Sequence, residues 1–256
     1  MKSVFESLLI AFSMYSAIPV PIVEWNEKNM RKAMYFFPLI SVACGLGLKL
    51  IWFIGRFFGL NNLFVAVMSV AMNVLITGGI HIDGFCDTSD ALYSRRPMER
   101  KLEILKDSHC GTFSVLALCV VLMLSCGAYS QLYEDGQSIL LISCIFAVSR
   151  CLSGISVMRF PITPTSSLAK TFNKTASKNT ALILSAELII VFTVMAFLNP
   201  KIAVCIIISA FFVFFGYRRM AVKEFGGITG DLAGFFLVVC ETVCLLLMAI
   251  LGGVLK

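Results

Sequence analysis

Seven long apolar stretches constrain the fold of this chain more than any other feature of its sequence. Each approaches the roughly 20 apolar residues that a helix needs to cross a bilayer. They lie at residues 33–57, 62–82, 112–133, 138–158, 179–198, 201–217 and 232–254. With 59% hydrophobic and only 14% charged residues in 256 positions, the chain is far more apolar than a soluble domain. We therefore predict an all-α, polytopic integral membrane protein with about seven transmembrane helices, forming one domain over residues 1–256.

A shorter apolar segment precedes these stretches, at residues 4–18. It is short for a bilayer crossing, and Pro19 and Pro21 follow it, where a helix would be interrupted. We expect a helix here that lies at the membrane interface or re-enters the membrane from one side.

The Lys and Arg residues gather in alternate loops between the predicted spans. Sixteen of the 21 fall in the N-terminal segment and in the loops after the second, fourth and sixth spans. Such loops mark the cytoplasmic side, so we predict a cytoplasmic N-terminus and a C-terminus on the opposite side. Because this topology signal accounts for most of the net charge of +6, we expect the lipid bilayer as partner and no nucleic acid.

Three aspartates end the second stretch, in the run from Gly78 to Asp90. In a helix, Asp83, Asp87 and Asp90 share one face because they are spaced four and three residues apart. Carboxylates at the end of a membrane span are costly, and three on one face repel each other unless a cation binds them. Hard oxygen ligands left partly open favour Mg²⁺ held together with a substrate phosphate. The pattern indicates phosphoryl chemistry at a membrane surface, and a solvated first helical turn is the alternative.

A second polar segment, from Asp107 to Thr112, opens the third span. Asp107 or Ser108 would cap that helix, but the free N–H groups of a helix start also suit a phosphate. His109 is a candidate proton acceptor for an attacking hydroxyl, and a purely structural loop histidine is the alternative.

A third segment, from Gly226 to Asp231, precedes the last span. Its glycines and Thr229 place backbone donors beside one carboxylate, which suits a phosphate or metal site as well as a plain turn. Glu241 follows about three helical turns later on the same face, and a glutamate inside the membrane is a functional hypothesis. Arg150, within the fourth span, needs an anion, either an acidic residue on another span or a substrate phosphate.

Together these segments resemble the cobalamin synthase family, the adenosylcobinamide-GDP ribazoletransferases. The resemblance runs over nearly the whole chain, and three separated motifs carry it. They are Gly78-Gly79-Ile80-His81-Ile82-Asp83-Gly84-Phe85-Cys86-Asp87-Thr88-Ser89-Asp90, Asp107-Ser108-His109-Cys110-Gly111-Thr112, and Gly226-Gly227-Ile228-Thr229-Gly230-Asp231 followed by Gly234 and Glu241. Two positions depart from the family motifs, because His109 stands in place of an arginine and Ile228 in place of a glutamine.

The resemblance implies an Mg²⁺-dependent glycophosphotransferase of the last stage of cobalamin biosynthesis. Such an enzyme joins adenosylcobinamide-GDP to α-ribazole or its 5′-phosphate, releases GMP and forms adenosylcobalamin or its 5′-phosphate. It implies a multi-pass protein of the bacterial cytoplasmic membrane with its active site facing the cytoplasm. It leaves open a homo-oligomer or association with other enzymes of the cobalamin pathway.

The expected site residues fall into three groups. The metal ligands would be Asp83, Asp87, Asp90 and Asp231. The catalytic residues would be Asp83, Asp87, His109 and Glu241. The substrate or phosphate contacts would be His81, Asp107, Ser108, Thr112, Arg150, Gly227, Thr229 and Gly230.

Two other classes of protein share part of the pattern. A CDP-alcohol phosphotransferase also places spaced aspartates at the membrane face, but its Asp-Gly-x-x-Ala-Arg pattern is absent after Asp83-Gly84. A transporter would line a pathway with intramembrane charges such as Glu187, Arg150 and Glu241. The acids instead cluster towards one side, and no inverted repeat is visible.

Overall fold

The computed structural model describes residues 2–30, 32–107, 109–163 and 179–252. This part of the chain is helical, without a named strand, which confirms the predicted all-α class. The helices are α1 (Lys2–Tyr15), α2 (Glu27–Met30), the 3₁₀ helix η1 (Ala33–Leu39), α3 (Ile40–Phe57), α4 (Asn62–Thr77), α5 (Ile80–Tyr93), α6 (Met98–Ile104), α7 (Thr112–Glu134), α8 (Ile139–Arg159), α10 (Thr180–Leu198), α11 (Pro200–Phe225) and α12 (Gly230–Gly252).

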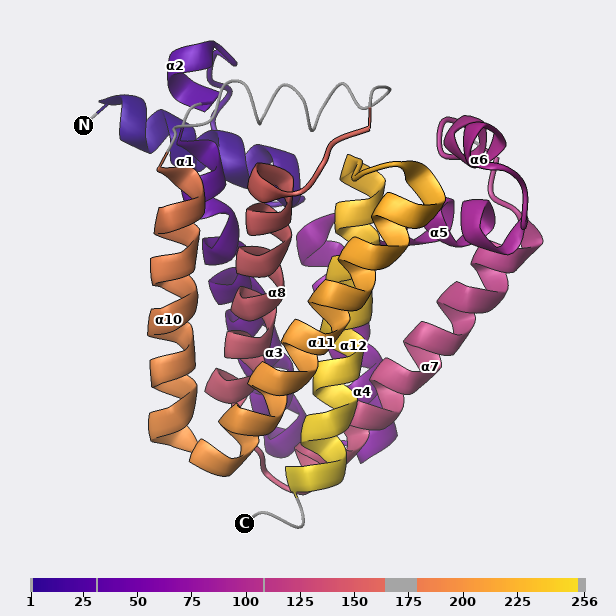
Figure 1. The fold of residues 1–256 in the computed structure, drawn as a ribbon. Helices are drawn as coiled ribbons and strands as arrows, with labels where there is room; N and C mark the ends of the chain where they lie inside the picture. The colour runs from indigo at the N-terminus through magenta and orange to yellow at the C-terminus, as the bar shows by residue number, and fades with distance from the viewer. Residues whose placement is uncertain (1, 31, 108, 164–178, 253–256) are drawn as a thin grey trace.

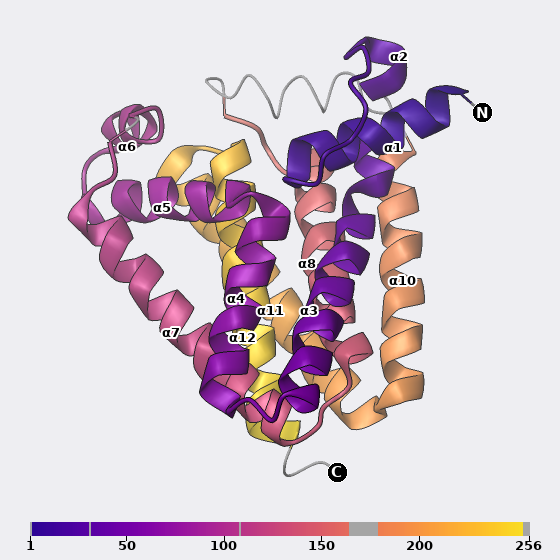
Figure 2. The same ribbon diagram turned by 180° about the vertical axis from the view of Figure 1, so that it is seen from behind.

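Six helices of the described chain are long and apolar enough to cross a membrane, with η1 and α3 counted as one. The helix α4 is a further member of the bundle and runs between the same two ends (Figures 1 and 2). With the bent pair of α4 and α5 counted as one span, there are seven. This agrees with the prediction of about seven.

The predicted span 62–82 is broken in the structure. Gly78 and Gly79 both adopt positive φ angles, 64° and 73°, a conformation that glycine reaches without steric cost and that ends helices. After them α5 leaves at 96° to α4 and lies across one end of the bundle (Figure 2). The aspartates at 83, 87 and 90 are therefore on a helix that lies across one end of the bundle.

The sixth predicted span is also corrected. It was expected at 201–217, but α11 continues to Phe225. The residues 218–225 that follow the apolar stretch contain no glycine or proline, so the helix continues through them. The helix ends where Gly226 takes φ 73°. Its last two turns carry Arg218, Arg219 and Lys223.

The two ends of the bundle differ, because the shorter helices α1, α5 and α6 gather at one of them. The helix α1 lies across the same end as α5 and α6, and α12 finishes at the opposite end (Figure 1). The short apolar helix predicted at 4–18 is thus confirmed as a helix that does not cross the bundle, although it ends at Tyr15. Large apolar side chains such as Phe53, Leu75 and Phe212 remain exposed on the outer faces, as a lipid environment requires.

Candidate active site

The helices α5 and α12 touch at the level of their backbones. A Cβ atom at Gly84 would lie 2.7 Å from the backbone oxygen of Asp231 and 2.8 Å from its Cα. One turn further along α12, a Cβ at Gly234 would lie 3.2 Å from the backbone oxygen of His81. Only glycine permits so close an approach. The contact brings the start of α12 beside the first acidic turn of α5.

A cavity of about 290 Å³ lies at this contact. Asp83 and Asp231, which are far apart in the sequence, both line it, and so do His81 and Gly230. The rest of its wall comes mainly from α1, η1, α8 and α12, namely Tyr15, Met34, Phe37, Ile80, Ser153, Val157, Ala233 and Gly234. Four residues that the sequence singled out therefore share one cavity.

The carboxylates around this contact influence one another. Burial, followed by the negative charges of Asp83, Asp231 and Asp90, raises the pKa of Asp87 to about 6. Within the described part of the chain, no hydrogen bond offsets this effect at Asp87. A half-buried carboxyl group with carboxylate neighbours and no donor is in an environment that a cation would stabilise.

These residues fit Mg²⁺ in one particular way. Among the described residues, no three Asp, Glu, His or Cys side chains already stand where they would hold a metal ion by themselves. Mg²⁺ commonly binds through one or two carboxylates and takes its remaining ligands from water and substrate phosphates. Asp83 and Asp87, one turn apart on α5, supply that number of carboxylates.

Asp90 has a partner that the sequence did not reveal. Its two carboxylate oxygens accept hydrogen bonds from the backbone N–H groups of Gly111 at 2.6 Å and of Ser114 at 2.9 Å. It thereby caps α7 from another helix. Position 111 favours glycine, since a Cβ there would lie 2.4 Å from the Asp90 carboxylate. The aspartate and the glycine of two separate motifs form one structural contact.

The described residues Asp107, His109, Cys110 and Thr112 of the second motif are exposed. The Oδ1 atom of Asp107 accepts a hydrogen bond from the backbone N–H of His109 at 3.0 Å and lies 2.6 Å from Nδ1 of the same residue. The hydrogen bonds from His109 lower the pKa of Asp107. Thr112 is the exposed first residue of α7, and Ser108 lies outside the described residues. Asp107 and His109 thus contact each other rather than the residues of the 290 Å³ cavity.

The loop between α11 and α12 is held by backbone contacts. Ile228 donates a hydrogen bond to the oxygen of Pro161 at 2.8 Å and accepts one from the N–H of Thr163 at 3.1 Å. A Cβ at Gly227 would lie 2.7 Å from that same Pro161 oxygen. The side chain of Ile228 is fully buried in the core. The departure from the family glutamine therefore places an apolar side chain in the interior.

Thr229 caps the last helix. Its Oγ1 accepts a hydrogen bond from the N–H of Leu232 at 3.2 Å and lies 3.4 Å from Oδ2 of Asp231. The cap fixes the first turn of α12, where free N–H groups and the helix dipole favour an anion.

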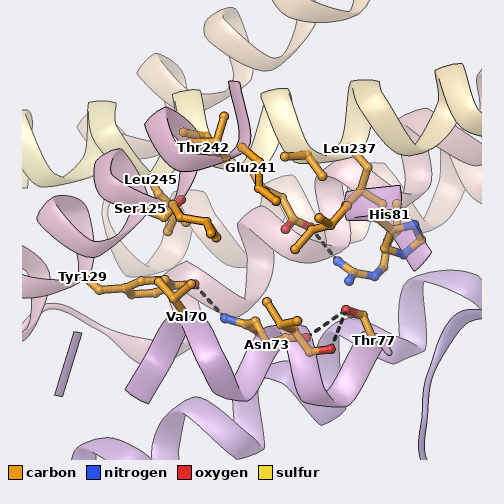
Figure 3. A pocket seen from close by; sticks show the side chains of 17 residues that line it. Val70, Asn73, Thr77, His81, Ser125, Tyr129, Leu237, Glu241, Thr242 and Leu245 are labelled. Atoms are coloured by element: carbon orange, nitrogen blue, oxygen red, sulfur yellow. Dashed lines mark hydrogen bonds and ion pairs between the residues drawn. The ribbon is translucent and has the colours of Figure 1, made fainter. Parts of the chain in front are cut away.

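Glu241 lies apart from Asp231, although both are on α12. Its Oε1 is 2.7 Å from Nη1 of Arg150 and accepts a hydrogen bond from Ser149 Oγ at 2.8 Å. This pair borders a second cavity of about 90 Å³ inside the bundle, which His81 also lines. Figure 3 shows Glu241 and His81 on one side of this cavity and Asn73 on the other. Of the two partners foreseen for Arg150, the structure thus provides the acidic residue on a neighbouring span.

Some residues of the larger cavity carried no signal in the sequence. Tyr15 looks like an ordinary apolar position, and only the placement of α1 over the end of the bundle brings it to the wall. Gly84 was part of a motif, but its role as a helix contact is visible only in three dimensions.

The apolar helices form a bundle, and a carboxylate-lined cavity lies at one end of it. The protein therefore belongs to the class of integral membrane proteins with an acidic site at one end of a helical bundle. Within this class the chain belongs to the Cobalamin-5-phosphate synthase family, whose model matches residues 7–249. No solved structure matches the chain.

Curated relatives support this membership over nearly their whole lengths. The chain is 42% identical to the adenosylcobinamide-GDP ribazoletransferase of Lachnoclostridium phytofermentans over 252 residues, covering 98% of this chain and 95% of the relative. It is 32% identical to the protein of the same name from Clostridium botulinum strain Alaska E43, with 95% and 96% covered. A Clostridium perfringens SM101 relative, again of that name, is 32% identical with 98% and 100% covered.

Proposed function

We propose that this protein is an adenosylcobinamide-GDP ribazoletransferase, which performs the final step of cobalamin synthesis. Its family and the names of its relatives support the activity. The observation that carries the proposal in the structure is the cavity shared by Asp83 and Asp231 at one end of the bundle. The family membership argues against the two alternatives, a transporter and a CDP-alcohol phosphotransferase.

The reaction requires a hydroxyl to attack a pyrophosphate. A ribose hydroxyl of α-ribazole, or of its 5′-phosphate, would form a new O–P bond at the phosphorus linked to cobinamide. The bond from that phosphorus to the bridging oxygen would break, and GMP would leave with this oxygen. Asp231 stands at the cavity wall, where its carboxylate would accept the hydrogen bond of the attacking hydroxyl.

Magnesium dependence is part of the proposal. Asp83 and Asp87 would hold the ion together with pyrophosphate oxygens, and Asp231 stands nearby as a further oxygen ligand. Bound Mg²⁺ would neutralise charge that develops on the phosphates. The first turn of α12, fixed by Thr229, offers backbone N–H groups to the same phosphates.

Glu241 receives a positioning role in this proposal. Its carboxylate is engaged by Arg150 and Ser149 and borders the inner cavity, not the one that contains Asp83. The ion pair ties α12 to α8, and α12 carries Asp231. Removing it would affect the placement of the reacting groups rather than remove a ligand.

The active site would face the cytoplasm. The segment around α6, the last residue of α8 (Arg159) and the last two turns of α11 are rich in described basic residues. These parts of the chain lie at the end of the bundle that carries the cavity (Figure 1). The positive-inside tendency of membrane proteins supports a cytoplasmic location for this end.

One assay tests the proposed function. Protein purified in detergent is incubated with adenosylcobinamide-GDP, α-ribazole and Mg²⁺, and GMP and the corrinoid product are quantified by chromatography. We expect GMP release that requires both substrates and is abolished by a chelator. Absence of GMP, under conditions in which the Lachnoclostridium phytofermentans relative is active, would disprove the activity.

A further inference from the structure

We propose that the 290 Å³ cavity binds the benzimidazole ring of α-ribazole, with the ribose directed towards Asp83 and Asp231. The proposal rests on the proposed function and adds to it the location of one of the two substrates. It is drawn from the size, the aromatic wall and the sparse polarity of the cavity.

Three aromatic rings stand together in the wall. The rings of Tyr15 and Phe37 are 4.3 Å apart between centroids, and Phe37 and His81 are 5.8 Å apart. Tyr15 and His81 lie nearly parallel, with an angle of 19° between their planes and 6.3 Å between centroids. Such a cluster offers faces and edges on which a flat aromatic ligand can stack.

The size of the cavity excludes the corrin ring of the other substrate. Its volume of about 290 Å³ is near the lower limit of small-molecule sites, which begin at about 300 Å³. A corrin ring with its side chains is several times larger than a bicyclic base, so it must remain outside. A single base with its sugar at the mouth matches the available space.

The polarity of the wall distinguishes between the two bases in the reaction. Met34, Val157 and Ala233 supply apolar surface. The hydroxyl of Tyr15 lies 3.4 Å from the Met34 sulfur, and Ser153 already donates to the backbone oxygen of Ala233 at 3.2 Å. With Asp83 and Asp231 directed to the sugar and phosphates, the rest of this wall would leave most polar edge atoms of guanine unpaired, which is costly.

The benzimidazole of a riboside has only one free ring nitrogen. His81 is 8% exposed and lines both this cavity and the inner one, and its Nε2 atom is buried without a hydrogen-bond partner among the described residues. Directed into the larger cavity, this nitrogen would donate to the one acceptor nitrogen of the ligand. Asp83 and Asp231, also in the wall, are then available to the ribose.

Two variants of the wall test the assignment. Val157→Phe fills part of the cavity, and Phe37→Leu replaces an aromatic face with a somewhat smaller aliphatic side chain. Val42→Phe is the matched control, because Val42 is 54% exposed on the outer face of α3. All three are first compared with the wild type for elution and thermal unfolding in detergent, so that a misfolded protein is recognised.

The measurement is the KM of each substrate, together with inhibition by free dimethylbenzimidazole. We expect both wall variants to raise the KM for α-ribazole by about tenfold and to change the KM for adenosylcobinamide-GDP less than about twofold. The free base should compete with α-ribazole in the wild type and in Val42→Phe, and more weakly in the wall variants.

The possible failures are distinct. A wild-type protein without any GMP release would overturn the proposed function and this assignment with it. An active wild type whose wall variants keep the α-ribazole KM would overturn only the assignment. A selective rise in the KM for adenosylcobinamide-GDP would place guanine in the cavity instead.

Discussion

The glycine contact between α5 and α12 allows a sharp test of how the candidate site is positioned. In Gly84→Ala, the new Cβ would lie 2.7 Å from the Asp231 backbone oxygen, and an ordinary contact begins at 3.4 Å. The two helices must therefore separate by about 0.7 Å, because the obstructing atoms belong to the backbone and cannot rotate away. This displacement moves Asp231 away from Asp83.

The expected loss follows from the sensitivity of catalysis to position. A misplacement of about 1 Å can cost on the order of 100-fold in rate, so we expect kcat of Gly84→Ala to fall by roughly 10-fold to 100-fold. The Mg²⁺ concentration for half-maximal rate should rise as well, since the carboxylates are displaced relative to each other. The protein should still fold, because alanine favours a helix over glycine by about 1 kcal/mol.

Two glycines serve as matched controls for this variant. A Cβ at Gly127 on α7 or at Gly216 on α11 would meet no atom within 4 Å. Their alanine variants should keep wild-type kcat and unfold at an equal or higher temperature. The assay measures GMP release against Mg²⁺ concentration, with thermal unfolding of the same preparations. A Gly84→Ala protein with kcat and Mg²⁺ dependence like those of Gly216→Ala would refute the reasoning.

Four further variants address the acidic residues. Asp83→Asn and Asp87→Asn should each abolish transfer in a folded protein, and GMP release within about threefold of wild type at saturating Mg²⁺ would remove both from the metal site. Asp90→Ala should lower the unfolding free energy by about 1 kcal/mol through loss of the cap on α7, measured by denaturant titration, and an unchanged stability would argue against this role. Glu241→Gln leaves Arg150 buried without its counter-charge, so we expect a destabilisation on the order of 3 kcal/mol. Its Mg²⁺ dependence should stay like that of wild type, and a large shift would return Glu241 to the metal site.

The sequence was informative about the spans because the bilayer imposes a length and a composition on each of them. The apolar stretch around 139–158 illustrates this, since α8 runs from Ile139 to Arg159. The bend at Gly78 was not part of the predicted span 62–82. Apolar residues such as Ile80 and Ile82 continue the pattern of α4 past the break, so composition alone extends the span. The packing of α5 on α12 decides that the chain turns.

The contents of the site were predictable only in part. Motifs marked Asp83 and Asp231, and the structure places both at one cavity. The cap that Asp90 forms on α7 joins two motifs, and a helical spacing rule cannot show it because it treats each helix separately. Similarly, Glu241 shares a helical face with Asp231 in sequence terms, but ten residues along α12 carry it deep into the bundle, beside Arg150.

The unequal ends of the bundle affect how the protein would behave in closed vesicles. The carboxylate-lined cavity lies at the end covered by α1, and α12 finishes at the other (Figure 1). Large, charged nucleotide substrates do not cross a lipid bilayer unaided, so a molecule inserted with α1 towards the lumen would be silent. The fraction of activity that appears only after the vesicles are opened would then report the orientation of the inserted protein.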